Sequence, residues 1–234
     1  MAFICLSGLS KTMSQYKLYG HPVSPYSYLV HAALVCKEID FEYIYVDLTS
    51  GAQKKTEFLD LSPYGQVPLL SNGDDLNIYE SWAIFEYLEE TYPKINMLPK
   101  EQPYRAITRS LCLALMTGII PSFRELFLHG LGRIQLPVEV QQNIIKSMTE
   151  KLTAFQAQRL TLGQPVVFCP IDAVFQQAWQ NMCFAWPLAS EEFPQLQEYF
   201  ESLQESPIIQ TVESHPAVKQ VREYFKGIIA ARTA

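Results

Sequence analysis

The chain has 234 residues, of which 48% are hydrophobic and 18% charged, the composition of a compact folded protein. Its net charge is -6 with a pI near 5.3, so it offers no broad basic surface to neutralise phosphates, and nucleic acid is not an expected partner. The sequence shows no uninterrupted apolar run of the length that crosses a bilayer, and we therefore expect no membrane partner.

Residues 1–15 are predicted to form a disordered or loosely attached tail. Their apolar stretch has no positive charge ahead of it, which makes a poor secretory signal. Met13 is a second natural start for the chain, and the sequence does not decide between Met1 and Met13. The five cysteines are odd in number and have no C-x-x-C spacing, so they indicate neither a disulfide framework nor a zinc site and favour a reducing cytoplasm.

The segment 16–92 alternates strand patterns with helical patterns, which predicts a small α/β domain built in layers. The apolar residues recur at intervals of two in the strands and of three or four in the helices. The order of the expected elements is a strand at 16–20, a helix from Pro25 to near Lys37, a strand at 41–46, an irregular link, a hairpin of 67–70 with 76–79 around S-N-G-D at 71–74, and a helix from Ser81 to about Tyr92.

Residues 93–103 hold three prolines and few strand formers, so they are predicted to be a linker. The remainder, 104–234, shows long helical patterns and no strand run of comparable quality, which predicts an all-helical second domain. Its expected helices lie at 104–128, 138–160, 170–184, 193–204 and 215–231.

Charge is divided unevenly between these two parts. Residues 1–92 contain five Lys or Arg and twelve Asp or Glu, a net charge near -7, whereas the rest of the chain is near +1. The overall field therefore opposes an anionic ligand in the first domain, and a few local donors would have to hold one.

The segment Ser24-Pro25-Tyr26-Ser27 lies between the first strand and the first helix. Backbone amides at a helix start favour a nearby anion, including a thiolate, and a serine hydroxyl there can donate to it and hold the thiol pKa down. The alternative is that Ser24 only caps the helix, with Pro25 in its first turn.

Two further segments can contact a peptide-like ligand. Pro68 enters a strand from the loop 62–67, so its bond to Val67 is a candidate cis peptide that would expose the amide and carbonyl of Val67. At the next helix start, Ser81 can offer its amide and hydroxyl to a carboxylate, while Glu80 can accept from an ammonium group. The alternatives are a plain proline-containing turn and an ordinary helix cap with an acidic neighbour.

In this order and spacing the three segments resemble the glutathione site of the soluble, cytosolic glutathione transferases, of a serine-type and bacterial-like class. The resemblance covers both domains but is specific only in the first. It implies the glutathione transferase fold, in which an α/β thioredoxin-like N-terminal domain is joined to an all-α C-terminal domain. It also implies a cytoplasmic protein, glutathione as cosubstrate without a metal, and a homodimer.

The resemblance also implies a role for each matching position. Ser24 matches the activating serine, and Phe123 and Phe127 lie where the family lines the pocket of a hydrophobic cosubstrate, although helical core is the alternative for both. The matching glutathione contacts are Val67 and Pro68 for the cysteinyl part, Glu80 and Ser81 for the γ-glutamyl end, and Gln66 and Lys54 for the glycine carboxylate.

The sequence departs from the family pattern at several points. Leu29 and His31 stand where relatives often carry basic residues, and Cys169 replaces the usual Ser or Thr cap ahead of Asp172, which should still take part in that helix start. A serine cannot form a mixed disulfide, so Ser24 disfavours thiol–disulfide exchange chemistry. His21 and His31 flank the site and are expected to be structural or to face solvent.

The leading hypothesis is conjugation of the glutathione thiolate to a hydrophobic electrophile, as in detoxification, with Ser24 stabilising the sulfur anion. A second hypothesis is a non-catalytic glutathione-transferase-like binding or regulatory module. A third is glutathione-dependent isomerisation of a small unsaturated acid, which calls for basic residues near the cosubstrate, and Arg105, Arg109 and Arg124 are available for it.

Overall fold

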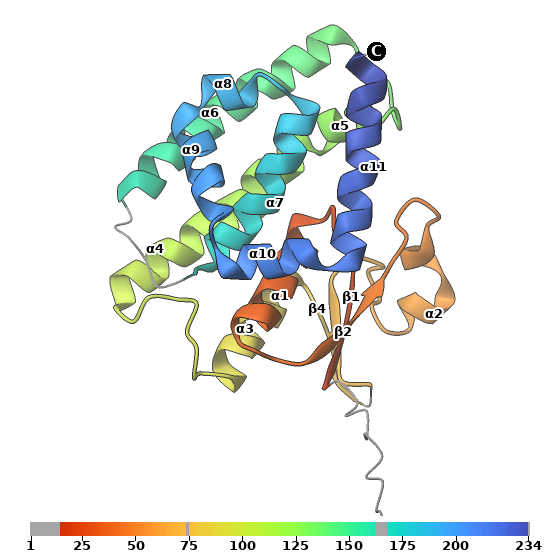
Figure 1. Ribbon diagram of the computed structural model, residues 1–234, viewed down its shortest axis with the longest axis vertical. Helices are drawn as coiled ribbons and strands as arrows, with labels where there is room; N and C mark the ends of the chain where they lie inside the picture. Colours follow the sequence, from red (N-terminus) through yellow and green to blue (C-terminus); the bar gives the residue numbers. More distant parts are fainter. Residues whose placement is uncertain (1–14, 74, 162–167, 234) are drawn as a thin grey trace, which may run out of the picture.

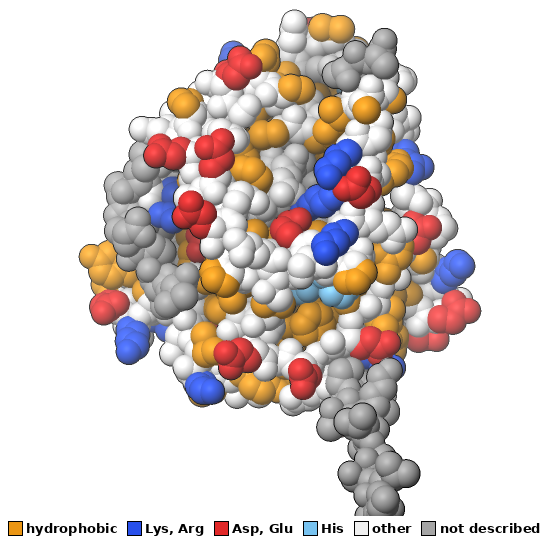
Figure 2. Space-filling model, in the orientation of Figure 1, with side chains coloured by type: hydrophobic (Ala, Val, Ile, Leu, Met, Phe, Trp, Pro, Cys, Tyr) orange, Lys and Arg blue, Asp and Glu red, His pale blue; other side chains and the backbone are white. Residues whose placement is uncertain are grey.

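The computed structural model describes residues 15–73, 75–161 and 168–233, and Figure 1 shows a small sheet with a larger helical part lying against it. Residues 1–14 of the expected tail 1–15, and Asp74 of the hairpin turn, lie outside the described residues. On the face drawn in Figure 2, Lys and Arg side chains are interspersed with Asp and Glu, so that face carries no single basic patch.

The sheet has four strands in the order β2-β1-β3-β4. The central strand β1 places Leu18 opposite Tyr43 of β2 in a parallel pair and opposite Leu70 of β3 in an antiparallel pair. Leu70 in turn faces Ile78 of β4, so the predicted hairpin is confirmed. The bounds are β1 Tyr16–Gly20, β2 Phe41–Tyr45, β3 Leu69–Ser71 and β4 Asn77–Tyr79.

Two helices of this part pack against each other beside the sheet, α1 (Pro25–Cys36) and α3 (Ser81–Thr91). The predicted irregular link between β2 and β3 is wrong in part, because it contains a 3-10 turn η1 (Ala52–Lys54) and a one-turn helix α2 (Thr56–Leu59). Elements of three or four residues are too short to display a helical repeat in the sequence. This sheet with its flanking helices is the small layered α/β domain that the sequence predicts.

The second part is helical throughout its described residues, as predicted. Seven of its helices begin on or next to a proline, which suits the first turn of a helix because proline has no amide hydrogen to leave unpaired. The bounds are α4 Gln102–Leu113, a π-helical segment η2 Ala114–Ile119, α5 Ile120–Gly130, α6 Val138–Thr161, α7 Pro170–Ala185, α8 Ala189–Glu192, α9 Pro194–Leu203, α10 Pro207–Ser214 and α11 Pro216–Thr233.

Some of these bounds correct the sequence analysis. The expected helix 104–128 is divided by η2, and the short helices α8 and α10 were not predicted at all. At the start of α7 the backbone amide of Cys169 donates to the Asp172 carboxylate at 2.8 Å, so Asp172 takes part in that helix start as predicted.

One continuous hydrophobic core runs through both parts of the molecule. Helix α1 is buried along nearly its whole length because it lies between the sheet and α7, its main helical neighbour in the second part. Figure 1 shows α11 standing over the end of the sheet, with α10 crossing at its foot.

Contrary to the sequence analysis, one helical stretch among the described residues, Gln102–Gly130, has the length and composition that a membrane crossing requires. The search for an unbroken apolar run missed this stretch, because it includes a few polar and charged positions. Half of its most apolar window is buried in the molecule, and its helices pack against α6 and α7. A core helix of a helical domain has the same composition, so the finding carries little weight for a membrane.

Candidate functional site

A cavity of about 1280 Å³ lies where the end of the sheet meets η2, α5 and α11. Its walls come from both parts of the chain, so the two domains form it together. All nine site residues predicted from the sequence line this cavity: Ser24, Lys54, Gln66, Val67, Pro68, Glu80, Ser81, Phe123 and Phe127.

Ser24 is the N-cap of α1, and its hydroxyl oxygen accepts a hydrogen bond from the backbone amide of Ser27 at 3.3 Å. A serine hydroxyl has one proton to donate and two lone pairs to accept with, so the cap bond leaves the proton available to a ligand in the cavity. The two interpretations of Ser24 are therefore compatible, since it caps the helix and also faces the cavity.

The loop before β3 presents its main chain to the cavity. The Val67–Pro68 peptide bond is cis, as the sequence analysis expected. Ser62 donates its hydroxyl to the Gln66 carbonyl at 3.3 Å, and Gly65 has a positive φ of 56° in a turn that a side chain would obstruct. The loop is thus held by its own contacts in the shape that exposes Val67 and Gln66.

Lys54 contributes the positive charge on this side of the cavity among the described lining residues. Its ammonium group donates to the Tyr64 carbonyl at 3.0 Å, which ties η1 to the loop before β3. The remaining ammonium hydrogens are available to a carboxylate, because a lysine has three donors.

Glu80 has a φ of 67°, in the left-handed region that residues with a side chain seldom occupy. It precedes α3, and its carbonyl accepts the first helical bond from Ile84 at 3.0 Å. Ser81, the first residue of α3, is 4% exposed. Unusual backbone angles of this kind concentrate at ligand sites, where the surrounding structure holds them in place.

His21 is buried beside Ser24 rather than exposed to solvent. Its Nδ1 accepts from the Val23 amide at 3.1 Å, and its Nε2 lies 3.2 Å from the Tyr45 hydroxyl. Burial lowers the pKa of His21 to about 4, with Asp47 opposing the shift. The imidazole is therefore neutral near pH 7 and a weak base, which fits the structural role predicted for it.

His31 is likewise structural, and the solvent-facing alternative is wrong for it. It is 3% exposed and its ring contacts Phe41, Tyr43 and His215. Burial, with a smaller contribution from His215, lowers the pKa of His31 to about 3.

The helical wall of the cavity is mostly apolar. Phe123 and Phe127 are 3% and 9% exposed, so they belong to the core and also line the cavity. Tyr26 of α1 donates its hydroxyl to the Met116 carbonyl at 2.8 Å, which joins the two walls at η2. One side of this wall was not predicted from the sequence, and it consists of Gln220, Val221, Tyr224 and Phe225 of α11.

Only one of the three arginines suggested by the sequence reaches the cavity. Arg105 donates to the Pro99 carbonyl at 3.2 Å and Arg109 pairs with Glu86 at 2.8 Å, whereas Arg124 lines the cavity. Arg133, which was not predicted, lines it as well. Arg133 lies beyond the end of α5, and its approach to the cavity depends on the path of the chain after that helix, which no pattern in the sequence indicates. Across residues 15–73, 75–161 and 168–233, no cluster of three His, Cys, Asp or Glu is placed to bind a metal.

Comparisons with known proteins agree with this architecture. A family model described as the N-terminal domain of glutathione S-transferase matches residues 14–90. The chain is 32% identical over 206 residues to Glutathione S-transferase Z2 of Arabidopsis thaliana, covering 83% of this chain and 88% of that protein. It is 40% identical over 119 residues to a probable maleylacetoacetate isomerase of Caenorhabditis elegans, covering 51% of this chain and 52% of that protein.

Among solved structures, maleylacetoacetate isomerase of Methylobacterium extorquens AM1, with bound malonate and GSH, is similar with a TM-score of 0.68 and 25% identity, over 86% of this chain and 98% of that one. The sheet domain and the helical domain together thus form the glutathione transferase fold, and the predicted fold class is confirmed. The chain belongs to the glutathione S-transferase family.

Proposed function

We propose that this protein binds glutathione along the first-domain wall of the cavity and transfers its thiolate to a hydrophobic electrophile held by the helical wall. The observation that carries the proposal is the meeting of Ser24, the Val67–Pro68 bend and the Glu80–Ser81 helix start in one cavity. In this arrangement the sulfur lies at Ser24, the cysteinyl backbone at Val67, and the γ-glutamyl end at Glu80 and Ser81.

The chemical task of Ser24 is to favour the ionised sulfur. A free thiol with a pKa of about 8.5 is only a few per cent ionised at pH 7, and lowering that pKa by about two units makes the thiolate dominant. This requires about 2.7 kcal/mol, which a hydroxyl donor and the start of α1 supply together. The cap bond from the Ser27 amide assists, because it draws electron density from the hydroxyl oxygen and strengthens the proton as a donor.

The test is Ser24→Ala, with Ser24→Thr as the matched variant that keeps a hydroxyl. We expect Ser24→Ala to lower turnover with an activated aryl halide by about tenfold at neutral pH, because the variant loses the hydroxyl's part of the two-unit pKa shift and keeps the helix start, while glutathione binds nearly as before. Loss of the cap will also cost about 1 kcal/mol of unfolding free energy, measured separately by denaturation. If Ser24→Ala is as active as the parent protein, Ser24 does not activate the thiol.

The competing hypothesis is a non-catalytic binding or regulatory module. A measurement on the parent protein distinguishes it from a transferase. Adding glutathione should produce the ultraviolet absorbance of a thiolate at neutral pH. If there is no such absorbance and no glutathione binding, transfer is ruled out and a binding or regulatory role is left.

A second candidate activity is glutathione-dependent isomerisation of a small unsaturated acid. Two observations favour it: Arg124 and Arg133 line the cavity, and the relatives include proteins named maleylacetoacetate isomerase. The two reactions differ in stoichiometry, because conjugation consumes one glutathione per turnover and isomerisation returns it. Glutathione consumption measured with a cis-unsaturated diacid therefore separates them.

The remaining attributes are proposals of the same kind. We propose a cytoplasmic homodimer, and we leave the class open between the serine-type, bacterial-like class that the first-domain segments suggest and the zeta class named among the relatives. Size-exclusion chromatography with light scattering tests the dimer directly.

A further inference from the structure

The peptide unit between Val23 and Ser24 is hydrogen-bonded at both ends. Its amide, on Ser24, donates to the His21 carbonyl at 2.9 Å, a local turn contact. Its carbonyl, on Val23, accepts from the side-chain amide of Asn181 at 2.8 Å, a contact from the second domain. A peptide unit is planar, so fixing both ends fixes its orientation. The Ser24 carbonyl accepts from the Tyr28 amide at 2.9 Å, which fixes the peptide unit on the other side of the Ser24 Cα, and the two units together set the direction in which the Ser24 side chain leaves the backbone.

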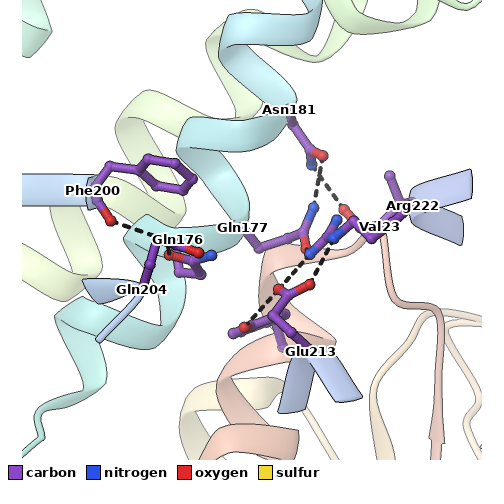
Figure 3. A network of polar contacts seen from close by, with 9 residues as sticks. Val23, Gln176, Gln177, Asn181, Phe200, Gln204, Glu213 and Arg222 are labelled. Atoms are coloured by element: carbon purple, nitrogen blue, oxygen red, sulfur yellow. Dashed lines mark hydrogen bonds and ion pairs between the residues drawn. The ribbon is translucent and has the colours of Figure 1, made fainter. Parts of the chain in front are cut away.

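Asn181 is itself held by a buried neighbour. Its side-chain oxygen accepts from the Gln177 amide at 2.8 Å, one turn earlier on α7. Gln177 is 0% exposed and Asn181 5% exposed, so both side chains depend on protein partners for their hydrogen bonds. Figure 3 shows Asn181 with one contact to Gln177 and the other to the Val23 carbonyl.

The chain of contacts continues to α11 and returns to α1. Arg222 donates to the Gln177 side-chain oxygen at 2.8 Å and pairs with Glu213 through two hydrogen bonds of 2.7 and 2.9 Å. Glu213 also accepts from the Tyr28 hydroxyl at 2.9 Å, and the Tyr28 backbone amide donates to the Ser24 carbonyl. The contacts therefore form a closed ring that begins and ends beside Ser24.

The ring also reaches the helical wall of the cavity. Arg222 lies on α11 between Val221 and Tyr224, which line the cavity. The same side chains thus orient the Ser24 peptide and hold α11 in place. A purely structural network would need only to satisfy its own polar groups, whereas this one bonds to the peptide that carries the proposed thiol activator.

We propose that Asn181 is a positioning residue for thiolate formation, and that the ring through Gln177, Arg222 and Glu213 holds its amide on the Val23 carbonyl. This inference rests on the proposed function, because it concerns the sulfur that Ser24 would stabilise. It assigns a role in activation to the helical domain, which is otherwise only the wall for the electrophile.

Two uncharged substitutions test the proposal without altering the local field. Asn181→Leu removes the donor, and Gln177→Met leaves the donor but removes the group that fixes it. The matched control is Gln180→Leu, on the same helix and outside the ring. The measurement is the pKa of the glutathione thiol bound to the full-length protein, followed by thiolate absorbance against pH, together with the dissociation constant of glutathione.

We expect Asn181→Leu to raise the pKa of the bound glutathione thiol by about one unit. At a pH below the thiol pKa of the parent protein, kcat/KM should then fall about tenfold. The affinity for glutathione should stay within about twofold of the parent value. Gln177→Met should shift the thiol pKa in the same direction by a smaller amount, and Gln180→Leu should not shift it. A thiol pKa in folded Asn181→Leu equal to that of the parent overturns the proposal, even if the variant is less stable.

Two further results, an unfolded Asn181→Leu variant and a parent protein that forms no thiolate, also have a definite interpretation. If Asn181→Leu does not fold, an unchanged thiol pKa in Gln177→Met overturns the proposal and a raised one supports it. If the parent protein itself forms no thiolate with glutathione, the proposed function fails before any variant is compared, and this inference fails with it.

Discussion

The two walls of the cavity are built by different means. On the first-domain side, main-chain features form the site: the helix start at Ser24, the cis bond before Pro68 and the left-handed Glu80. On the helical side, side chains such as Phe123 and Tyr224 project from helix faces onto the cavity. The first wall therefore depends on a few exact backbone positions, while the second depends on how whole helices pack.

This difference indicates which changes each wall tolerates. A helix face can exchange one apolar side chain for another of similar volume at modest cost, so the helical wall is free to vary with the electrophile. A backbone position that requires a cap, a cis proline or a positive φ accepts few residue types. The substitutions below test whether the first wall is indeed the less tolerant, starting with the largest expected effect.

The ends of α1 and α3 farthest from the cavity are joined by a buried ion pair. Lys37 and Glu89 are 2.7 Å apart with side-chain exposures of 0% and 4%. Lys37 also donates to the carbonyls of Tyr92 and Ile95, at 3.0 and 2.7 Å. The pair therefore joins the two helices whose first turns, after Ser24 and at Ser81, line the cavity.

Lys37→Met should lower the free energy of unfolding by about 3–5 kcal/mol, because it leaves the Glu89 carboxylate buried without its partner. Chemical denaturation measures the loss. The double variant Lys37→Met with Glu89→Gln should be more stable than the single variant, since it removes the unpaired charge and keeps an acceptor for the Met97 amide. Lys226→Met, in an exposed pair, is the control and should change stability by less than about 0.5 kcal/mol. If Lys37→Met lowers the free energy of unfolding as little as this control does, the Lys37–Glu89 pair does not hold α1 and α3 together.

Gly65 offers the second test, on the loop before β3. It has a φ of 56°, and an added Cβ would lie 2.6 Å from the Gln53 carbonyl oxygen, closer than backbone atoms permit. Gly65→Ala should therefore cost about 2–4 kcal/mol, from the backbone strain and the collision together. Under the proposed function it should also weaken glutathione binding, because the loop carries Gln66 and Val67.

Gly51 is the matched control for this substitution. Its φ is 73°, but nothing lies within 4 Å of an added Cβ. Gly51→Ala should cost only the strain of the left-handed conformation, about 1–2 kcal/mol. Equal losses in thermal or chemical unfolding for the two alanine variants would mean that the Gly65 loop yields to the collision and is not rigid.

The contrast between the walls also explains what the sequence could predict. Strand β1 and the starts of α1 and α3 were predicted to the residue, because caps, prolines and short repeats are local signals. Ser24, Val67–Pro68 and Ser81 carry local signals of the same kind, but their grouping into one site came from the resemblance of their order and spacing to the glutathione transferases. Their placement along one cavity required only that the predicted elements assemble in the expected order.

The helical wall gave weaker signals because its site is a product of packing. Phe123 and Phe127 follow a helical repeat that is equally typical of core, and nothing local indicates that α11 would turn Tyr224 toward them. Asn181 is one of several polar residues of α7, and its buried position requires a hydrogen-bond partner that the sequence does not name. That partner, the Val23 carbonyl, is 158 residues away in the chain.

The contact between Tyr26 and Met116 joins the two walls and gives the smallest expected effect. The Tyr26 hydroxyl donates to the carbonyl of Met116 at 2.8 Å, within the π-helical segment η2 that lines the cavity. Segments of this kind often occur at functional sites, because their widened turn changes which carbonyls and side chains face inward. Tyr26→Phe removes only the donor and keeps the ring in place.

We expect Tyr26→Phe to lower the free energy of unfolding by about 0.5–1.5 kcal/mol, the usual net value of one hydrogen bond. Tyr104→Phe, on an exposed tyrosine of α4, is the control and should change it by less than about 0.5 kcal/mol. If the walls act independently, kinetic constants should be unaffected. If η2 depends on the first domain for its shape, KM for the electrophile should rise about two- to threefold while KM for glutathione stays constant, because Met116 lines only the helical side. A rise in KM for glutathione alone would contradict this division of the cavity into two walls.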